Sequence, residues 1–414
     1  MSALQPVRGT HDLLPEDMRR FREVADTARR AALCFGYHEV ATPIFEFTEV
    51  FKRTLGDTSD VVTKEMYTFT DKGGETVTLR PEGTAGVARA LISGGLTQHL
   101  PLKYFYVGPM FRYERPQKGR LRQFHQTGVE LLGVKEPQGD VEVIAIGVEF
   151  LRRIGAWDRC ELELNTLGDT PSRQAYRRVL IDYLNDFRDR LSKDSLDRLE
   201  KNPLRVLDSK DEGDQKIVAD APLYSDYLSQ EAQDFFGRVK SGLDDLGIGY
   251  RINPRLVRGL DYYCHTCFEI TCPELGAQKT VLAGGRYDGL VGMMGGPETA
   301  GVGWASGVER CSMLLKETPA AARPIAIVPL GEAAERKASQ LAGELRAKDF
   351  LVDLGYSGNM GKRMKRANKI EAIVAVILGD DEIAKGEVSL KLLDTGEQKN
   401  VRLDELEAAL AAHR

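Results

Sequence analysis

The chain has 414 residues, of which 42% are hydrophobic and 29% are charged, and its formal net charge is −5 at pH 7. This length allows two or three domains with separate cores, and the composition is typical of a globular protein in water. No apolar run approaches the roughly 18 residues of a membrane-spanning helix. The charge excludes a generally basic protein, although a local basic face can still bind nucleic acid.

The N-terminal residues and the cysteines indicate the compartment. Asp12, Glu16 and Asp17 follow the start closely, which is unlike a signal peptide or an acid-poor transit peptide. Two of the six cysteines, Cys264 and Cys267, form a Cys-x-x-Cys sequence in a predicted strand. Side chains three apart on a strand point to opposite faces, so these thiols cannot share a zinc ion or close a relaxed disulfide. We therefore expect a cytoplasmic protein with packing cysteines and no zinc.

The first part of the chain predicts a helix and then an edge strand. Residues 15–34 have a proline in the first turn, acidic residues at the positive end, and Phe21, Val24 and Ala28 at helical spacing. The segment 36–45 that follows contains Pro43. A proline favours an edge strand or a strand interruption, which is common at subunit seams.

Residues 76–92 combine a short strand, a turn and a helix. The strand at 76–79 runs into Glu82-Gly83-Thr84, and the helix covers 87–92. A carboxylate and a hydroxyl at this turn can cap the helix. They can equally bind the ammonium group of a ligand, so both roles stay open.

Two strands at 103–114 and 121–132 predict a hairpin, and its turn at 115–120 carries three cations and no anion. The residues of the second strand that share one face are Arg122, Phe124, Gln126, Gly128 and Glu130. Polar and aromatic side chains on a single face are typical of a ligand platform. An exposed outer face is the alternative, which Phe124 fits poorly.

The middle of the chain changes character. A helix at 140–154 and a strand at 160–165 precede a helical insertion at about 170–247, which is rich in charges of both signs. Residues 256–270 then have the aromatic and β-branched composition of a strand. This strand also carries an arginine, an aspartate and two tyrosines, and a structural strand seldom packs so many polar groups because each unpaired one costs free energy.

Two glycine-rich segments, 281–290 and 300–315, follow that strand. Gly301-x-Gly303 is like the start of a dinucleotide fingerprint, but the third glycine is one residue late and no crossover strand with an acidic end follows. The chain has no Walker A sequence either. Any ATP must therefore be held by another route.

The chain after Pro324 predicts a separate domain. Strands at 325–330, near 351 and at 372–378 alternate with helices at 333–348 and 362–369, which implies a parallel-type sheet. The cations of the second helix are Lys362, Arg363, Lys365, Arg366 and Lys369. A solvated face is the usual explanation of such a run, and a contact with a phosphate backbone is the alternative.

Together these segments resemble class II aminoacyl-tRNA synthetases, and within them the histidyl-tRNA synthetase family. Residues 36–45 resemble the first class signature, Phe-Arg-Tyr-Glu at 111–114 with its loop the second, and residues 301–310 the third. The signatures specific to the histidine enzymes are Arg-Gly-Leu-Asp-Tyr-Tyr at 258–263 and Gly-Gly-Arg-Tyr-Asp-Gly at 284–289. Both are complete, and the resemblance runs from about residue 7 to the C-terminus.

The resemblance implies an α+β fold and an ATP-dependent ligase. Residues 1–320 would form a class II catalytic domain on an antiparallel sheet flanked by helices, and residues 324–414 an anticodon-binding α/β domain. The enzyme would activate L-histidine with ATP and transfer it to the 3′ end of histidine tRNA. The family also implies a homodimer, no membrane partner, and a magnesium ion that arrives with ATP.

The same resemblance implies roles for individual residues. Arg258 would be the catalytic cation beside the reacting phosphate. The implied histidine-binding residues are Glu82, Gly83, Thr84, Gln126, Glu130, Tyr262 and Tyr263. The implied ATP-binding residues are Arg112, Glu114, Arg120, Arg122, Phe124 and Arg310, with either Arg120 or Arg122 at the outer phosphates. The implied tRNA contacts are Lys118, Lys362, Arg363, Lys365 and Arg366.

Two non-catalytic relatives are alternative interpretations. One binds histidine and regulates a biosynthetic phosphoribosyltransferase, and the other binds tRNA without chemistry. The first is expected to lack the anticodon domain and to have eroded signatures. Arg112, Arg258, Arg310 and the domain after Pro324 argue against both.

Overall fold

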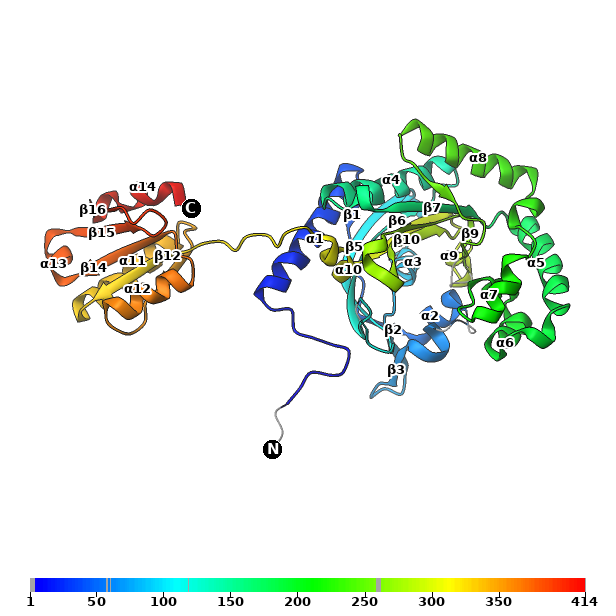
Figure 1. Cartoon of the computed structure of the whole chain (residues 1–414), viewed down its shortest axis with the longest axis horizontal. Coiled ribbons are helices and arrows are strands. Elements are labelled where there is room, and N and C mark those ends of the chain that lie inside the picture. The colour runs from blue at the N-terminus through cyan, green and yellow to red at the C-terminus, as the bar shows by residue number, and fades with distance from the viewer. Residues whose placement is uncertain (1–3, 57–58, 60, 118, 258–261, 414) are drawn as a thin grey trace. The chain divides into compact units, whose positions relative to one another are not determined.

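The computed structural model of this protein describes residues 4–56, 59, 61–117, 119–257 and 262–413. The chain divides into two compact units, residues 1–319 and 320–414, each with a sheet of its own (Figure 1). Among the described helices, none is long and apolar enough to cross a membrane.

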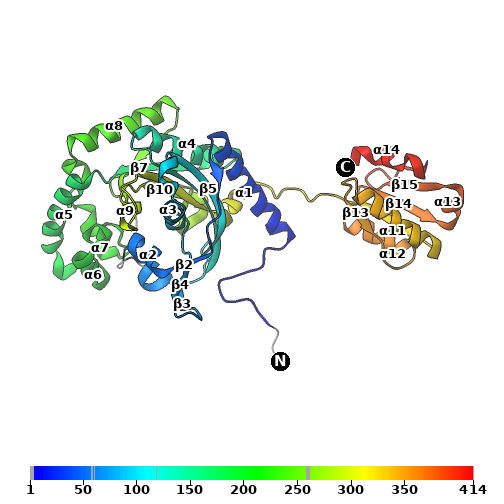
Figure 2. The same cartoon turned by 180° about the vertical axis from the view of Figure 1, so that it is seen from behind.

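A sheet in the order β1-β5-β6-β11-β10-β9-β7-β8 forms the centre of the first unit (Figure 2). All pairs from β5 across to β7 are antiparallel, and the edge strands β1 and β8 run parallel to their neighbours. The strands are β1 (His38–Glu39), β5 (Leu102–Phe111), β6 (Gln123–Leu132), β7 (Glu161–Thr166), β8 (Arg251–Ile252), β9 (Cys264–Thr271), β10 (Thr280–Arg286) and β11 (Gly301–Gly307). The predicted fold class, hairpin and edge strand are confirmed.

Four helices cover one face of this sheet and bury a single apolar core with it. They are α1 (Pro15–Cys34), α4 (Pro137–Arg153), α8 (Gln230–Asp245) and α10 (Val308–Leu314). The bounds of α1 are those predicted. Val24 and Ala28 of its predicted stripe are buried, and Phe21 is half-buried. The apolar period of the sequence therefore decided both the helix and its orientation.

The opposite face of the sheet carries a second core, which extends into the helical insertion. The elements on this side include a small sheet in the order β2-β4-β3. They are β2 (Phe45–Phe47), α2 (Thr48–Leu55), η1 (Val61–Glu65), β3 (Tyr67–Thr70), β4 (Thr76–Leu79), α3 (Thr84–Ser93), η2 (Leu96–His99) and α9 (Leu290–Met293). The predicted strand at 76–79 is β4, and the helix predicted at 87–92 begins three residues earlier, as α3.

The insertion is helical, as predicted. Its elements before α8 are α5 (Thr170–Asn185), η4 (Arg188–Arg190), α6 (Lys193–Lys201), η5 (Pro203–Asp208), α7 (Glu212–Ala219) and η6 (Tyr224–Tyr227). Val239 and Leu243 of α8 are buried in the same core as α4. The last helix of the predicted insertion therefore belongs to the body of the first unit.

The predicted strand at 256–270 is too long. Strand β9 begins at Cys264, because Leu256 and Val257 lie in irregular chain after a turn, and residues 258–261 lie outside the described part. Cys264 and Cys267 pair with consecutive residues of β10, across a shift in register where His265 has a positive φ of 43°. Consecutive strand residues face opposite sides, so these two free thiols also do.

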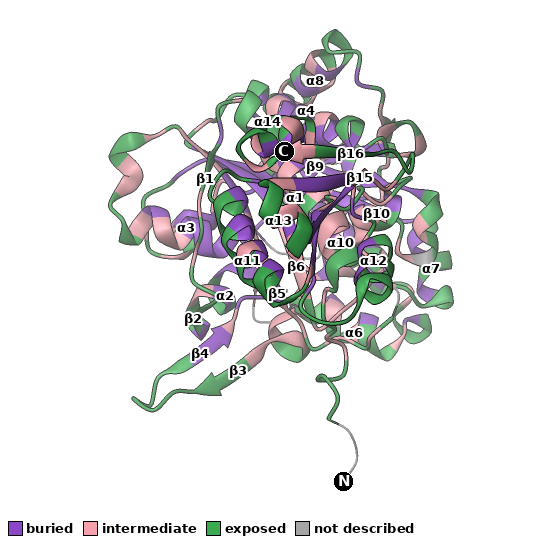
Figure 3. Ribbon diagram, turned by 90° about the vertical axis from the view of Figure 1, so that its left-hand side faces the viewer, coloured by how far each residue is buried: buried purple, intermediate pink, exposed green. Residues whose placement is uncertain are grey.

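The second unit has a sheet in the order β13-β12-β14-β15-β16. Strands β13 (Val352–Leu354), β12 (Ile325–Leu330) and β14 (Val374–Gly379) are parallel, as predicted. The unpredicted strands β15 (Glu387–Leu392) and β16 (Gln398–Arg402) add an antiparallel hairpin. The helices are α11 (Glu332–Arg346), α12 (Met360–Lys369), α13 (Asp380–Lys385) and α14 (Leu406–Leu410). Helix α11 has a buried and an exposed face, as amphipathic spacing requires (Figure 3).

Four short helices complete the described chain. They are η3 (Trp157–Arg159), η7 (Pro273–Gln278) and the C-terminal pair η8 (Leu403–Glu405) and η9 (Ala411–His413).

Candidate active site

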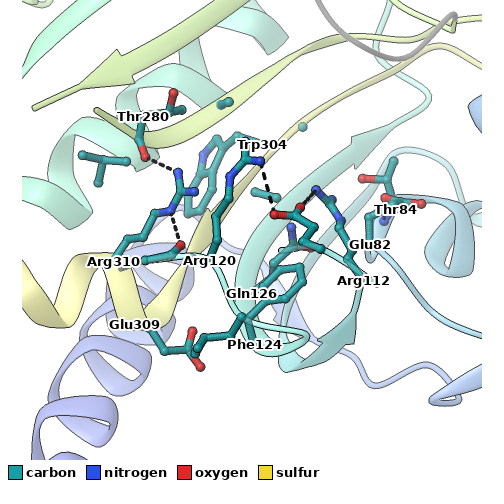
Figure 4. A pocket seen from close by; sticks show the side chains of 18 of the residues that line it. Glu82, Thr84, Arg112, Arg120, Phe124, Gln126, Thr280, Trp304, Glu309 and Arg310 are labelled. Atoms are coloured by element: carbon teal, nitrogen blue, oxygen red, sulfur yellow. Dashed lines mark hydrogen bonds and ion pairs between the residues drawn. The ribbon is translucent and has the colours of Figure 1, made fainter. Parts of the chain in front are cut away.

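A cavity of about 230 Å³ lies over strands β6, β10 and β11, beside the first residues of α3 and α10 (Figure 4). The predicted site residues that line it are Glu82, Thr84, Arg112, Glu114, Arg120, Phe124, Gln126, Tyr262, Tyr263 and Arg310. These predicted residues come from five separate segments of the first unit and meet at one place. Arg258 and Lys118 lie outside the described residues.

One end of the cavity is cationic. The guanidinium groups of Arg112 and Arg120 approach the same carboxylate, that of Glu114, at 3.9 and 3.3 Å. Arg310 is fixed beside them, since its Nε donates to the carbonyl of Gly119 at 3.0 Å and its Nη1 to that of Thr280 at 2.9 Å (Figure 4).

Burial lowers the pKa of Arg310, and the neighbouring Arg120 lowers it further. This end holds three arginines against the carboxylate of Glu114, and the second carboxylate there, that of Glu309, is bound by His125. A polyanionic ligand would therefore relieve the repulsion between the arginines. Guanidinium groups bind phosphate oxygens in bidentate pairs, which suits them to a triphosphate.

Arg112 and Phe124 form a wall between the two ends. Arg112 donates through Nε to the carbonyl of Pro81 at 2.9 Å, and its guanidinium carbon lies 5.4 Å from the centre of the Phe124 ring. The backbone contact fixes the arginine, and the ring offers an apolar surface in the cavity. A planar base can stack on such a ring.

The other end of the cavity is acidic and begins at α3. The carboxylate of Glu82 accepts the N–H groups of Thr84 and Ala85 at 2.6 and 2.9 Å, and so caps the helix. Capping, one of the two roles open from the sequence, is therefore present. Glu82 also lines the cavity, so its carboxylate has one side toward a ligand.

Glu130 lies beneath this end and is completely buried. Its Oε1 accepts the Thr84 hydroxyl at 2.6 Å, and its Oε2 accepts the hydroxyl of Tyr287. Burial raises the pKa of Glu130 to about 8, although these two hydrogen bonds oppose the rise. The carboxyl can therefore exchange a proton near neutral pH.

Gln126 contributes a polar atom that faces the cavity without a partner. Its Oε1 is buried and accepts no hydrogen bond from any described residue, and its side chain lines the cavity. Buried polar atoms nearly always have a hydrogen-bond partner. A donor group of a bound ligand is the partner that this position can receive.

Four tyrosines surround the acidic end. The rings of Tyr262 and Tyr263 lie 4.6 Å apart, and Tyr262 meets the edge of Tyr287 at 5.8 Å. Tyr106 lies under them, with its ring against Gly83 and Gly128. A Cβ on either glycine would lie within 2.5 Å of that ring, so Gly83 serves packing and does not line the cavity.

Arg122 lies away from the cavity. Its guanidinium stacks on the Tyr113 ring at 3.9 Å and its Nε donates to the carbonyl of Glu114 at 3.2 Å. Of the two arginines that were alternatives for the outer phosphates, Arg120 is the one that lines the cavity.

Three residues at the acidic end escaped the sequence reasoning: Tyr106, Tyr287 and Gly303. A Cβ at position 303 would lie 1.9 Å from Glu130 Oε2, so only glycine leaves room for the carboxylate. Tyr287 and Gly303 belong to the two glycine-rich segments, which was a usable signal. For Tyr106 the sequence offered no signal other than its position on the inner face of β5.

The arginine beside Tyr287 has a structural task. Arg286 is fully buried and forms an ion pair with Asp140 of α4, which is also fully buried. It donates to the carbonyl of Val134 at 2.9 Å and to Asp288 at 3.0 Å. This network fixes the end of β10, from which Tyr287 reaches Glu130.

The predicted tRNA-binding cations of helix α12 differ in their exposure. Arg363 is buried, with its guanidinium on the carbonyls of Pro329 and Gly358 and on Glu335. Arg363 therefore holds the second unit together. Its guanidinium is not accessible, which argues against the contact with tRNA predicted for it. Lys362, Lys365 and Arg366 are exposed.

Known proteins are similar to this chain in both of its units. Residues 9–311 match the family model described as histidyl-tRNA synthetase, and residues 324–413 match the anticodon binding domain.

The histidine--tRNA ligases of Rhodospirillum rubrum and Gluconacetobacter diazotrophicus are 61% and 58% identical to this chain, each over 99% of both chains. The crystal structure of apo S. aureus histidyl-tRNA synthetase superimposes with a TM-score of 0.84 at 34% identity, over 98% of this chain and 99% of that one. The chain belongs to the histidyl-tRNA synthetase family.

Proposed function

We propose that this cavity activates L-histidine with ATP to histidyl-adenylate and diphosphate, and that the enzyme then transfers histidine to the 3′ end of histidine tRNA. The observation that carries the proposal is the division of one cavity into an end with three arginines and an end with Glu82, Gln126 and the tyrosines. The first end suits a triphosphate, and the second suits an amino acid with a polar side chain.

ATP would occupy the cationic end. Adenine stacks on Phe124, Arg112 binds the α-phosphate, and Arg120 and Arg310 bind the outer phosphates. The backbone carbonyls that hold Arg310, and the Pro81 carbonyl that holds Arg112, fix these cations before the substrate arrives. Fixed charges of this kind need no reorganisation during the reaction.

Histidine would occupy the acidic end. Its ammonium group lies between Glu82 and Gln126, with the Thr84 hydroxyl close by, and its imidazole lies toward Glu130 and Tyr263, with Tyr262 beside it. Glu130 can accept an imidazole N–H when ionised. A site of buried hydrogen-bonding groups rejects amino acids that leave those groups unpaired, so selection needs no editing step.

The chemical step follows from these positions. A carboxylate oxygen of histidine attacks the α-phosphorus, and the bond from that phosphorus to the oxygen of the leaving diphosphate breaks. Negative charge grows on the α-phosphate oxygens, where Arg112 stabilises it more in the transition state than in the ground state. Arg258, outside the described residues, retains its proposed role as a second cation there. The carboxylate is already ionised, so no protein base is needed.

The second step transfers the acyl group. A ribose hydroxyl of the terminal tRNA nucleotide attacks the carbonyl carbon of the adenylate, an ester bond forms, and AMP leaves. The same arginines then neutralise the phosphate of the leaving AMP.

Magnesium would accompany the outer phosphates and neutralise part of their charge. The residues at that end fit a hard cation: Glu114 and Glu309 line the cavity, and the buried Oε2 of Glu114 has only the ion pair with Arg120 at 3.3 Å among the described residues. Mg²⁺ commonly takes one or two carboxylates and completes its shell with phosphates and water.

We propose residues 1–320 as the catalytic domain, with the insertion at 170–247, and 324–414 as the anticodon-binding domain, in a cytoplasmic homodimer. The tRNA contacts proposed in the second unit are Lys362, Lys365 and Arg366, which are exposed. Tyr356 adds a stacking surface, since its side chain is 74% exposed and Arg366 lies over it.

Exchange of labelled diphosphate into ATP tests the first step without tRNA. We expect exchange that depends on histidine and magnesium. The Arg258→Ala variant should lose exchange and keep histidine binding in a calorimeter. A folded wild-type protein without exchange would refute the proposed activity.

A further inference from the structure

The segment that precedes the tyrosine pair is bound to the helical insertion by an arginine. Arg255 lies between β8 and β9, and its guanidinium donates to three main-chain carbonyls, one at the last residue of α7 and two just after this helix. The bonds are to Ala219 at 2.9 Å, Ala221 at 2.6 Å and Pro222 at 3.3 Å. Carbonyl oxygens at a helix C-terminus carry partial negative charge, which a cation stabilises.

A second arginine makes the reverse connection. Arg173 of α5 donates to the main-chain carbonyl of Tyr263. The start of α5 is itself fixed, because Asp169 accepts the N–H of Ser172 at 2.8 Å and the hydroxyl of Ser229 at the start of α8. The insertion thus holds the chain on both sides of residues 258–261, at Arg255 and at Tyr263.

Apolar packing joins the same two parts. Tyr262 and Tyr263, which are 3% and 7% exposed, belong to the same buried core as Tyr176 and Leu180 of α5. The hydroxyl of Tyr176 donates to the Pro222 carbonyl at 3.0 Å, the carbonyl that Arg255 also uses. The tyrosine wall of the cavity therefore rests on the insertion.

The sheet holds this segment from its other side. The side-chain amide of Asn165 in β7 donates to the carbonyl of Leu256 at 2.9 Å. The segment consequently lies between a rigid strand and the insertion, and loss of the insertion's bonds would leave one side unsupported.

We infer that the insertion positions the histidine-binding wall, and that Arg173 and Arg255 are positioning residues that set the affinity for histidine. This inference rests on the proposed function, because it takes Tyr262 and Tyr263 as part of the histidine site. Neither arginine is among the described residues that line the cavity. Both act through the main chain of the segment they hold, and so differ from residues that touch the substrate.

The test compares Arg173→Met and Arg255→Met with wild type in diphosphate exchange without tRNA. Methionine keeps an unbranched apolar stem and removes the donors. We expect the KM for histidine to rise roughly ten- to hundredfold, since misplacement by about 1 Å can have effects of this size. The KM for ATP should change less than about twofold, because the arginines of the phosphate end are held elsewhere.

The matched control is Arg178→Met. Arg178 lies on the same helix, is exposed, and its Nε donates only to Gln174 within α5 among the contacts of the described chain. It should leave both KM values unchanged. Thermal unfolding of each variant separates positioning from instability, and Arg255→Lys, which keeps a cation, should recover part of the histidine affinity.

The outcomes are distinct. Histidine affinity that stays at the wild-type value in both methionine variants would overturn the inference, and so would equal increases in the KM for histidine and for ATP. Absence of exchange in the wild type would instead refute the proposed function. In that case calorimetric binding of histidine to the same variants still decides the inference.

Discussion

Replacement of Glu130 by glutamine should stabilise the ligand-free protein while it weakens histidine binding. Glu130 is completely buried, and its pKa is about 8 in the folded protein against an ordinary 4.5, chiefly because of burial. Between these values the folded state holds a proton that the unfolded state has released. Stability therefore falls as the pH rises through this window. By pH 7 the loss amounts to roughly 3 kcal/mol at about 1.4 kcal/mol per pH unit.

Glutamine has the same shape and does not ionise, so Glu130→Gln should avoid this loss. Its carbonyl oxygen can still accept the Thr84 hydroxyl, and Gly303 leaves the same room. We expect the variant to be more stable at pH 8 by up to roughly 4 kcal/mol, and the difference to shrink toward pH 5. The KM for histidine in diphosphate exchange should rise about ten- to hundredfold, because a hydrogen bond to a charged group contributes about 1.5–3 kcal/mol.

Urea unfolding of both proteins from pH 5 to pH 8.5, without substrates, measures the difference. Glu163→Gln is the control with the opposite sign. Burial alone would raise the pKa of Glu163, but hydrogen bonds from Asn253 and Lys279 outweigh it and lower the pKa. This glutamate stabilises the fold above its ordinary pKa, so its glutamine variant should be less stable at pH 8. If Glu130→Gln shows no advantage there, or an advantage independent of pH, the reasoning about Glu130 is wrong.

Three further substitutions test two other parts of the site and one buried arginine of the second unit. Arg310→Met should raise the KM for ATP about ten- to hundredfold and leave histidine binding unchanged in a calorimeter, because it removes a charge-assisted contact at the phosphate end only. Gly303→Ala should destabilise the fold by about 1–3 kcal/mol and abolish exchange, because its Cβ meets the Glu130 carboxylate and the Val129 carbonyl; Gly237→Ala in α8, with open space around it, should do neither. Arg363→Met should lower the stability of the second unit by about 1–3 kcal/mol and slow aminoacylation, while exchange stays intact.

Local patterns predicted strand β6 of the cavity but not strands β10 and β11, whose segments were described only as glycine-rich. The alternation along 121–132 placed Phe124 and Gln126 on one face, and both line the cavity. The bond from Tyr287 to Glu130, in contrast, joins residues 157 positions apart and depends on the register of β6, β11 and β10. The periodicity of a single segment carries no information about contacts between residues so far apart in the sequence.

Two errors in the sequence predictions have the same origin. The composition of 256–270 is that of a strand throughout, but Leu256 is bound by Asn165 and the preceding Arg255 by the insertion, so the start of the segment does not join the ladder. Arg363 carries the same charge as its neighbours on α12, but it lies on the face toward β12 and reaches the Pro329 carbonyl. Tertiary contacts decided both cases, and composition cannot report them.

The partners of each arginine in this protein indicate its task. Arg286 and Arg363 are buried, and their donors meet carboxylates and main-chain carbonyls. Such arginines have few N–H donors left for a ligand, since each guanidinium has only five. Arg112 and Arg120 instead share one carboxylate at the cavity, and Arg310 lies close enough for Arg120 to lower its pKa. Unbalanced positive charge is unfavourable without a ligand, so it persists where a polyanion is bound. In a chain with a net charge of −5, this local excess of cations is the feature on which the proposed binding of the ATP phosphates rests.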